Sequence, residues 1–187
     1  MKPVGTTADA YLPIIEGCLK NNRLAQQKMY EKLAPRMFAL CMRYIGEREA
    51  ARDVLHDAFI ILFRKLESYN GSGSFEGWAR RIFVTAALMQ LRKKDALKFS
   101  VEIENALSIQ SDTENALQKM DAAKLMKLVM EMPAGFRTVF NMFAIEGFSH
   151  SEIAKTLNIT EGGSRSQLSR ARIWLQERLK REEIYDR

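Results

Sequence analysis

Apolar residues recur every three or four positions along most of this 187-residue chain, and that spacing is typical of amphipathic helices. The four prolines and ten glycines are interpreted as breaks between these periodic segments. The pattern therefore predicts an all-α fold.

The amino-terminal part of the chain is predicted to hold three helical regions. The first spans about residues 11–45 and ends at Gly46, because glycine readily takes the left-handed conformation that closes a helix. The second begins at Glu47, since an acidic residue suits the positive end of the helix dipole. After turn residues, Ser74 is placed to cap a third helix over residues 75–94. The stripe of the second helix that we expect in the core consists of Ala51, Val54, Leu55, Ala58, Phe59, Leu62 and Leu66.

The helical period weakens from about residue 96, and the composition there becomes acidic. We therefore expect two small helical domains, over residues 1–98 and 116–187, joined by a flexible acidic linker over residues 99–115.

The second domain is predicted from its capping and stop signals. Ser111 and Glu114 form a capping-box pattern for a helix that ends at Pro133, because proline disfavours helical geometry in the residue before it. The next helix runs from Pro133 to residue 146 and stops at Gly147. The last two helices are expected over residues 149–157 and from Glu161 to about residue 180.

These last two helices form a helix-turn-helix pattern, in which the second helix can enter the major groove of DNA. Ser149 and Glu152 supply a capping box before the first of them. The inner face of the final helix is expected to carry Leu168, Ala171, Leu175 and Leu179. The residues expected to face outward, toward bases and phosphates, are Gly162, Arg165, Ser166, Ser169 and Arg172, with Arg170 beside them. A basic, solvated helix of an ordinary helical hairpin is the alternative interpretation.

The helix predicted over residues 75–94 interleaves basic and aromatic side chains, a combination that suits single-stranded nucleic acid. Trp78 and Phe83 are expected in the core, since aromatic residues at helical spacing usually pack there. Tyr69, in the Gly-Ser turn, is therefore the preferred base-stacking residue. The basic residues of this helix are Arg80, Arg81, Arg92, Lys93 and Lys94.

Asp53 and Asp57 lie four residues apart, beside His56, on the face opposite the apolar stripe. They could be metal ligands or an acid–base pair, part of an ordinary solvated face, or a docking face for a basic partner. The docking face is favoured because two acids would otherwise repel each other at this spacing. A metal site would need further ligands, and the other histidine, His150, is interpreted as a polar first-turn residue.

Charge and composition narrow the function classes. A formal charge of +6 and a pI near 9.4 favour a polyanionic partner. The longest stretch without a charged residue has ten residues, Ile82 to Leu91, whereas a membrane-spanning helix needs about 20 apolar residues. The first residues lack the apolar run of a signal peptide, so we expect a cytoplasmic protein without membrane insertion. Cys18 and Cys41 are expected as reduced core residues, and no motif indicates catalysis, a metal or another cofactor.

The order of these segments resembles bacterial RNA polymerase sigma factors of the extracytoplasmic function group, reduced to their region 2 and region 4 domains. Residues 53–59 resemble the stretch that contacts the clamp helices of core polymerase. Residues 69–75 and 78–82 resemble the loop and helix that melt and read the minus-ten promoter element. Residues 146–154 and 164–172 resemble the helix-turn-helix of region 4.

This resemblance covers about residues 23–179 and assigns a role to each candidate residue. It implies that Asp53, His56 and Asp57 bind core polymerase. The residues implied at the minus-ten element are Tyr69, Asn70, Gly71, Ser72, Arg80, Arg81, Thr85 and Arg92. The residues implied at the upstream, minus-thirty-five element are Arg165, Ser166, Ser169, Arg170 and Arg172. The implied partners are core RNA polymerase, promoter DNA and an anti-sigma factor.

Three positions depart from the family pattern. Thr85 stands where the family usually has Asn, and Met89 stands where it often has Asp, so the resemblance does not fix the base preference at the minus-ten element. His56 stands where Gln is usual, and it keeps a hydrogen-bond donor. The sequence thus predicts a non-enzymatic promoter-specificity subunit. The alternatives are a free-standing helix-turn-helix repressor and a metal-dependent helical hydrolase that uses Asp53, His56 and Asp57.

Overall fold

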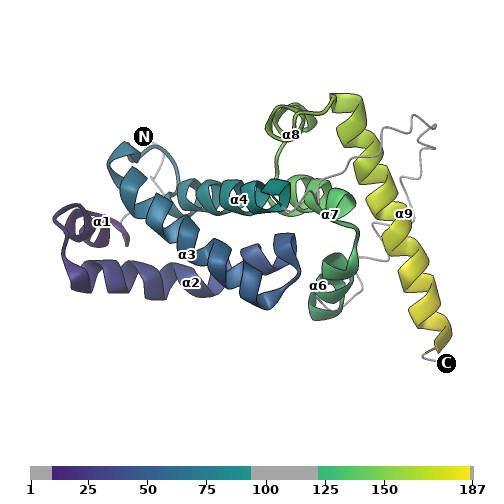
Figure 1. Ribbon diagram of the computed structural model, residues 1–187, viewed down its shortest axis with the longest axis horizontal. Coiled ribbons are helices and arrows are strands. Elements are labelled where there is room, and N and C mark those ends of the chain that lie inside the picture. The colour runs from purple at the N-terminus through teal and green to yellow at the C-terminus, as the bar shows by residue number, and fades with distance from the viewer. Residues whose placement is uncertain (1–9, 94–121, 186–187) are drawn as a thin grey trace, which may run out of the picture. The chain divides into compact units, whose positions relative to one another are not determined.

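The computed structural model describes residues 10–93 and 122–185, and every regular element in these ranges is a helix (Figure 1). The prediction of an all-α chain is therefore confirmed. The prediction of two small domains is confirmed as well, because the chain divides into two compact units after Leu91. The predicted linker over residues 99–115 and the predicted capping box at Ser111 lie outside the described residues. No helix within the described ranges has the length and apolar character needed to cross a membrane.

The first unit begins with two helices where the sequence predicted one continuous region. α1 spans Leu12–Leu19 and α2 spans Arg23–Ile45. Between them, Asn21 has a left-handed φ of 56°, and the Asn22 side chain accepts hydrogen bonds from two backbone N–H groups in the first turn of α2. Asparagine tolerates left-handed backbone and is a preferred N-cap. The Asn21–Asn22 pair was therefore the sequence signal for this break.

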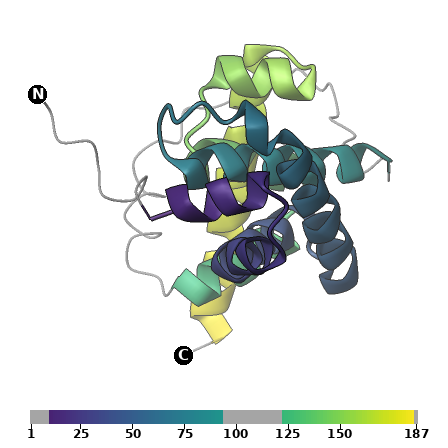
Figure 2. The same ribbon diagram turned by 90° about the vertical axis from the view of Figure 1, so that its left-hand side faces the viewer.

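α1 crosses α2 and packs against it, as Figure 2 shows with α2 seen nearly end-on. A Cβ atom added to Gly17 would lie only 2.5 Å from the Cβ of Ala25. The close approach of the two helices thus depends on glycine at this position.

α2 agrees with the prediction at its end and departs from it in its interior. Gly46 closes the helix with a left-handed φ of 79°, as expected. Pro35, however, lies inside α2, so the interpretation of every proline as a break is wrong. Packing of the helix on its neighbours outweighs the local cost of the missing N–H group.

α3 (Arg48–Lys65) supplies much of the core of the first unit. All seven residues of the predicted stripe, which ends at Leu66 in the 3-10 turn η1 (Leu66–Ser68), are buried, which confirms that prediction. α4 (Phe75–Lys93) packs on α3 through Phe83, whose ring meets the Phe59 ring edge-on at 5.1 Å between centroids. Cys18 and Cys41 are buried and free, as expected.

The second unit starts with α6 (Ala122–Glu131) and α7 (Ala134–Phe140), with Pro133 between them as predicted. The chain then forms a π-helical turn, η2 (Asn141–Ile145), where the sequence predicted continuation of one helix to residue 146. Turns of this kind insert one residue into the hydrogen-bond ladder, and hydrophobic periodicity does not reveal them.

α8 (His150–Leu157) and α9 (Glu161–Tyr185) complete the unit and pack against each other. Both predicted helices are confirmed, and α9 extends beyond the predicted end near residue 180. α9 also packs against α7, so the last helix of the chain is held by several elements of its own unit.

Candidate nucleic-acid interface

The acidic residues of α3 lie on its exposed face. Asp53, His56 and Asp57 are all exposed, while Val54 and Leu55 beside them are buried. Two carboxylates one helical turn apart therefore face solvent on a helix whose other side is fixed in the core. The prediction that these three residues lie opposite the apolar stripe of α3 is confirmed.

The same face of α3 continues with an apolar residue that sequence reasoning missed. Ile60 is 50% exposed, and its spacing of three residues from Asp57 and seven from Asp53 places it on their side of the helix. Single exposed apolar residues are common on protein surfaces, so Ile60 extends this face without identifying it as a binding surface by itself. The helical spacing of Ile60 from the two aspartates was the sequence signal that could have placed it on this face.

The side chains described over residues 10–93 and 122–185 include few close groupings of metal-ligating types. In these ranges no three His, Cys, Asp or Glu side chains gather closely enough to hold a metal ion.

The loop at residues 69–74 is ordered by its own hydrogen bonds. The Tyr69 hydroxyl donates to the Gly73 carbonyl at 2.8 Å, and the Asn70 side chain accepts from the Ser72 backbone N–H at 3.0 Å. Gly71 and Gly73 have φ values of 76° and 80°, which other residues rarely adopt. The loop is thus a defined structure rather than an open tether.

Tyr69 is half-buried rather than freely presented. Its ring contacts Phe75 edge-on at 5.2 Å and Trp78 at 5.4 Å between centroids. Trp78 is also half-buried, so its predicted place in the core is only partly correct, whereas Phe83 is fully buried as predicted. Tyr69 and Trp78 together form the aromatic surface next to this loop.

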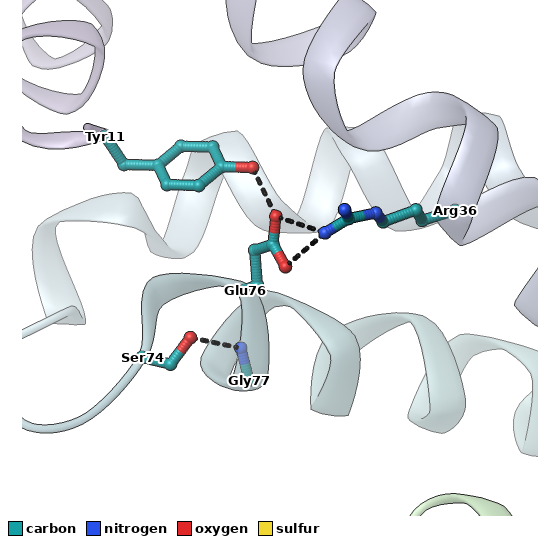
Figure 3. Close-up of polar contacts among 5 residues, drawn as sticks. All are labelled: Tyr11, Arg36, Ser74, Glu76 and Gly77. Atoms are coloured by element: carbon teal, nitrogen blue, oxygen red, sulfur yellow. Dashed lines mark hydrogen bonds and ion pairs between the residues drawn. The ribbon is translucent and has the colours of Figure 1, made fainter. Parts of the chain in front are cut away.

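α4 begins directly after the loop, and Ser74 helps to start it. Its hydroxyl accepts a hydrogen bond from the Gly77 backbone N–H at 3.4 Å, as the sequence predicted (Figure 3). Glu76, in the same turn, accepts bonds from Tyr11 and Arg36.

The basic residues of α4 do not all share one face. Arg81, Thr85 and Arg92 are exposed, and their spacing of four and seven residues aligns them along the helix. Met89, which is 51% exposed, lies in the same row. Arg80 is exposed as well but points about a quarter-turn away, because neighbouring residues are rotated by about 100°. The Thr85 hydroxyl donates to the Arg81 carbonyl at 2.8 Å, which ties its side chain to the helix backbone.

The helix-turn-helix of the second unit has the capping that its sequence predicted. The Ser149 hydroxyl accepts from the Glu152 backbone N–H at 3.2 Å, and the Glu152 carboxylate accepts from the Ser149 N–H at 2.8 Å. The turn ends at Thr160, whose hydroxyl accepts from the Gly163 N–H at 2.9 Å and so starts α9.

α9 presents a basic face at its amino-terminal end. Leu168, Ala171 and Leu175 are buried as predicted, whereas Leu179 is only half-buried. Arg165 is exposed and pairs with Glu161 at 2.9 Å. The other predicted contact residues are half-buried at the edge of this face: Ser166, Ser169, Arg170 and Arg172.

His150 joins the two helices of the motif, so its interpretation as a simple first-turn residue is incomplete. Its Nδ1 atom shares a 2.9 Å hydrogen bond with the Ser164 hydroxyl of α9, and its ring stacks on Phe143 at 4.5 Å. Ser164 is fully buried, although the sequence placed no polar residue on the inner face of α9. Burial and the nearby Arg165 lower the pKa of His150. The imidazole therefore favours its neutral form between the two helices.

Comparisons with known families agree with both halves of the chain. The family model for Sigma-70 region 2 matches residues 29–97, and that for Sigma-70 region 4 matches residues 122–175. The two matches together contain α3, the loop at residues 69–74, α4 and the helix-turn-helix.

Related proteins point to one group within this family. The chain is similar to the ECF RNA polymerase sigma factor SigE of Mycolicibacterium smegmatis, at 29% identity over 78% of this chain and 58% of that protein. It is 26% identical to the ECF RNA polymerase sigma-E factor of Escherichia coli K12, over 85% of this chain and 88% of that protein. Its fold is similar to that of the sigma factor RpoE from Bartonella quintana, solved in complex with the anti-sigma factor NepR. That likeness has a TM-score of 0.52 and 22% identity, over 82% of this chain and 96% of the other. The chain is a member of the extracytoplasmic function group of sigma factors in the sigma-70 family.

Proposed function

We propose that this sigma factor binds core RNA polymerase, reads two promoter elements and opens the DNA at the downstream one. Support comes from three surfaces that the sequence predicted: the acidic face of α3, the loop with α4, and the amino-terminal end of α9. In each of them the polar residues are exposed or at the edge, while buried apolar residues such as Val54, Phe83 and Leu168 hold the opposite side of the same helix. This division is the observation that carries the proposal, because it places the recognition groups at the surface, where a large partner can reach them.

Core polymerase is proposed to dock on the acidic face of α3. Asp53 and Asp57 would pair with basic groups of the polymerase, and His56 would donate a hydrogen bond. Ile60 would add an apolar contact in the same interface. Charged groups of this kind set orientation and association rate, and an apolar neighbour adds affinity by leaving water.

The minus-ten element is proposed to meet the loop and α4. Tyr69, Asn70, Gly71 and Ser72 would receive an extruded base, and unstacking that base costs a few kcal/mol, which stacking must return. The cations and the hydroxyl along α4 would follow the backbone of the opened strand, and these are Arg80, Arg81, Thr85 and Arg92.

The upstream box is proposed to bind the amino-terminal end of α9. Arg165 and Arg170 are suited to bidentate contacts with guanine, while Arg172 would neutralise phosphate. Ser166 and Ser169 would contact bases or phosphates at the edge of the same surface.

The proposal also covers the location of the protein in the cell, its domain bounds and a further partner. We infer a cytoplasmic protein without catalytic activity of its own, whose domains span residues 1–98 and 116–187 around an acidic linker at 99–115. The proposed mechanism is binding energy alone, so it needs no cofactor. An anti-sigma factor is proposed as a further partner, which would cover the polymerase-binding and DNA-binding faces.

Transcription with purified components tests this proposal. The full chain is added to core RNA polymerase on a pool of genomic fragments, and new transcripts are sequenced. We expect a small set of promoters with two shared boxes, and none of these transcripts with core polymerase alone. Specific binding to a palindromic site without polymerase would instead support the repressor, and stoichiometric tight metal binding would support the hydrolase. The match of residues 29–97 to region 2 weighs against both alternatives.

A further inference from the structure

A polar contact joins α1 to the helix that follows the proposed promoter loop. The Tyr11 hydroxyl, at the start of α1, donates a 2.7 Å hydrogen bond to Oε1 of Glu76 in the first turn of α4. Arg36 of α2 donates to both oxygens of the same carboxylate, at 2.9 and 2.8 Å (Figure 3). Three helices of the first unit therefore converge on Glu76.

Tyr11 is the better shielded of the two donors to Glu76. Tyr11 is 7% exposed, whereas the Arg36 side chain is 67% exposed, so water and salt screen the ion pair far more than the hydroxyl bond. Burial and the hydrogen bond to Glu76 raise the pKa of Tyr11 to about 12. The hydroxyl consequently stays protonated and keeps donating throughout the physiological pH range.

The ring of Tyr11 also reaches the loop through an unbroken series of aromatic contacts. It packs on Phe75 at 5.1 Å between centroids, and Phe75 in turn contacts Tyr69 at 5.2 Å and Trp78 at 5.6 Å. Tyr69 then closes the loop through its bond to the Gly73 carbonyl. Two ring contacts, from Tyr11 to Phe75 and from Phe75 to Tyr69, thus connect Tyr11 to the loop.

We propose that α1 is a positioning element for promoter opening, in which Tyr11 fixes Glu76 and Phe75 and thereby holds the loop at residues 69–74 in its opening conformation. Tyr11 is a positioning residue, because it acts through its neighbours and not on DNA. This inference rests on the proposed function of the loop. It adds to the region 2 family match, which begins at residue 29 and does not include α1.

The energetic scale of the contact indicates a measurable effect. Loss of a hydrogen bond to a charged group corresponds to about a tenfold to hundredfold change in an equilibrium constant, and the lower end is expected here because Arg36 still pairs with Glu76. The Tyr11→Phe substitution removes the hydroxyl and retains the ring that packs on Phe75. We therefore expect promoter opening to slow by up to about tenfold, with core polymerase binding unchanged.

The experiment compares a duplex promoter with the same promoter already opened. Holoenzyme is formed with wild type, with Tyr11→Phe or with the matched control Tyr30→Phe, which removes a tyrosine hydroxyl elsewhere in the first unit. Permanganate reactivity is followed over time on a linear promoter recovered from the genomic pool, and transcript yield is measured on a copy with a mismatched minus-ten box. We expect Tyr11→Phe to open the duplex slowly but to transcribe the mismatched copy normally, and Tyr30→Phe to match wild type on both.

Two results would overturn the inference while leaving the proposed function in place. One is wild-type opening of the duplex by Tyr11→Phe, and the other is an equal loss on both templates, which would indicate general structural damage. A wild-type holoenzyme that fails to open any promoter would overturn the proposed function itself, and this inference with it.

A double variant tests whether Tyr11 acts through Glu76. In a Glu76→Ala background the hydroxyl has no carboxylate to bind, so Tyr11→Phe should cause no further slowing of duplex opening. Additive losses in the double variant would show that Tyr11 acts by another route, and the proposed contact would be rejected.

Discussion

Reversal of charge at Asp53 and Asp57 should abolish tight binding to core polymerase without unfolding the protein. Both residues are exposed on α3, and the helix is held from its other side by buried residues such as Val54 and Ala58. The double variant Asp53→Lys with Asp57→Lys therefore changes the proposed docking face and leaves the core untouched.

The structure separates the expected effects on stability and on binding. Substitutions at exposed positions usually change the free energy of unfolding by no more than about 0.5 kcal/mol. Two lysines at this spacing repel each other about as much as two aspartates do, so the stability of α3 should change little. In contrast, the loss of one partner of a desolvated charge pair costs about 2 to 5 kcal/mol of binding free energy. That cost corresponds to about a thirtyfold to five-thousandfold weaker complex.

The assay titrates labelled protein against core polymerase and compares the dissociation constants. A matched control, Glu16→Lys with Glu31→Lys, makes the same gain in positive charge at exposed positions of α1 and α2. We expect the control to bind within about threefold of wild type, because exposed charges outside an interface contribute little. Circular dichroism of all three proteins should show equal helical content.

Two outcomes would refute the assignment of the acidic face. If the Asp53 and Asp57 double variant binds as tightly as wild type, polymerase does not dock on this part of α3. If the control loses as much affinity as the double variant, net charge and not local pairing governs the association, and the losses should then fade in high salt.

Three further predictions concern the loop and the second unit. Replacement of residues 69–74 by a Gly-Ser linker of equal length should preserve polymerase binding but abolish strand opening, and a permanganate footprint identical to wild type would contradict this. Arg165→Ala should cost about 1 to 3 kcal/mol of DNA binding and relax the preference for one or two bases, whereas Arg172→Ala should weaken all sequences alike and flatten the salt dependence. Selection from a randomised upstream box at two salt concentrations distinguishes these results. Because the pKa of His150 is lowered in the folded chain, the unfolded chain binds its proton more readily, and stability should fall as the pH drops below about 6.5. Chemical denaturation across this range should show a weaker pH dependence for His150→Gln.

The helices could be predicted from sequence because their periodicity and end signals agree. The stripe of α3 is buried as predicted, and Gly46 and the Ser149 capping box lie at helix ends as expected. The errors occur where a local signal was weak or was outweighed by packing. Pro35 is retained within α2, and the Asn21–Asn22 break was hidden inside an otherwise helical pattern.

The exposed faces could be predicted in part, since helical spacing shows which residues share a side. It placed Asp53 and Asp57 correctly on the outside of α3. It also places Ile60 on the side of the two acids, but Ile60 and Met89 were not assigned to these faces, because exposed apolar residues look like core residues in a list of hydrophobic positions. Only the structure shows that each of them interrupts a polar face.

Contacts between helices could not be predicted, because periodicity describes one helix at a time. His150 and Tyr11 illustrate this limit. Each looked ordinary at the start of its own helix, yet one reaches Ser164 across the helix-turn-helix and the other reaches Glu76 across the first unit. Each hydrogen bond ends in the first turn of a helix that is proposed to contact DNA, α9 for Ser164 and α4 for Glu76. Because recognition groups must be held to within about 0.5 Å of their productive geometry, we expect positioning contacts of this kind to affect how well the recognition residues work.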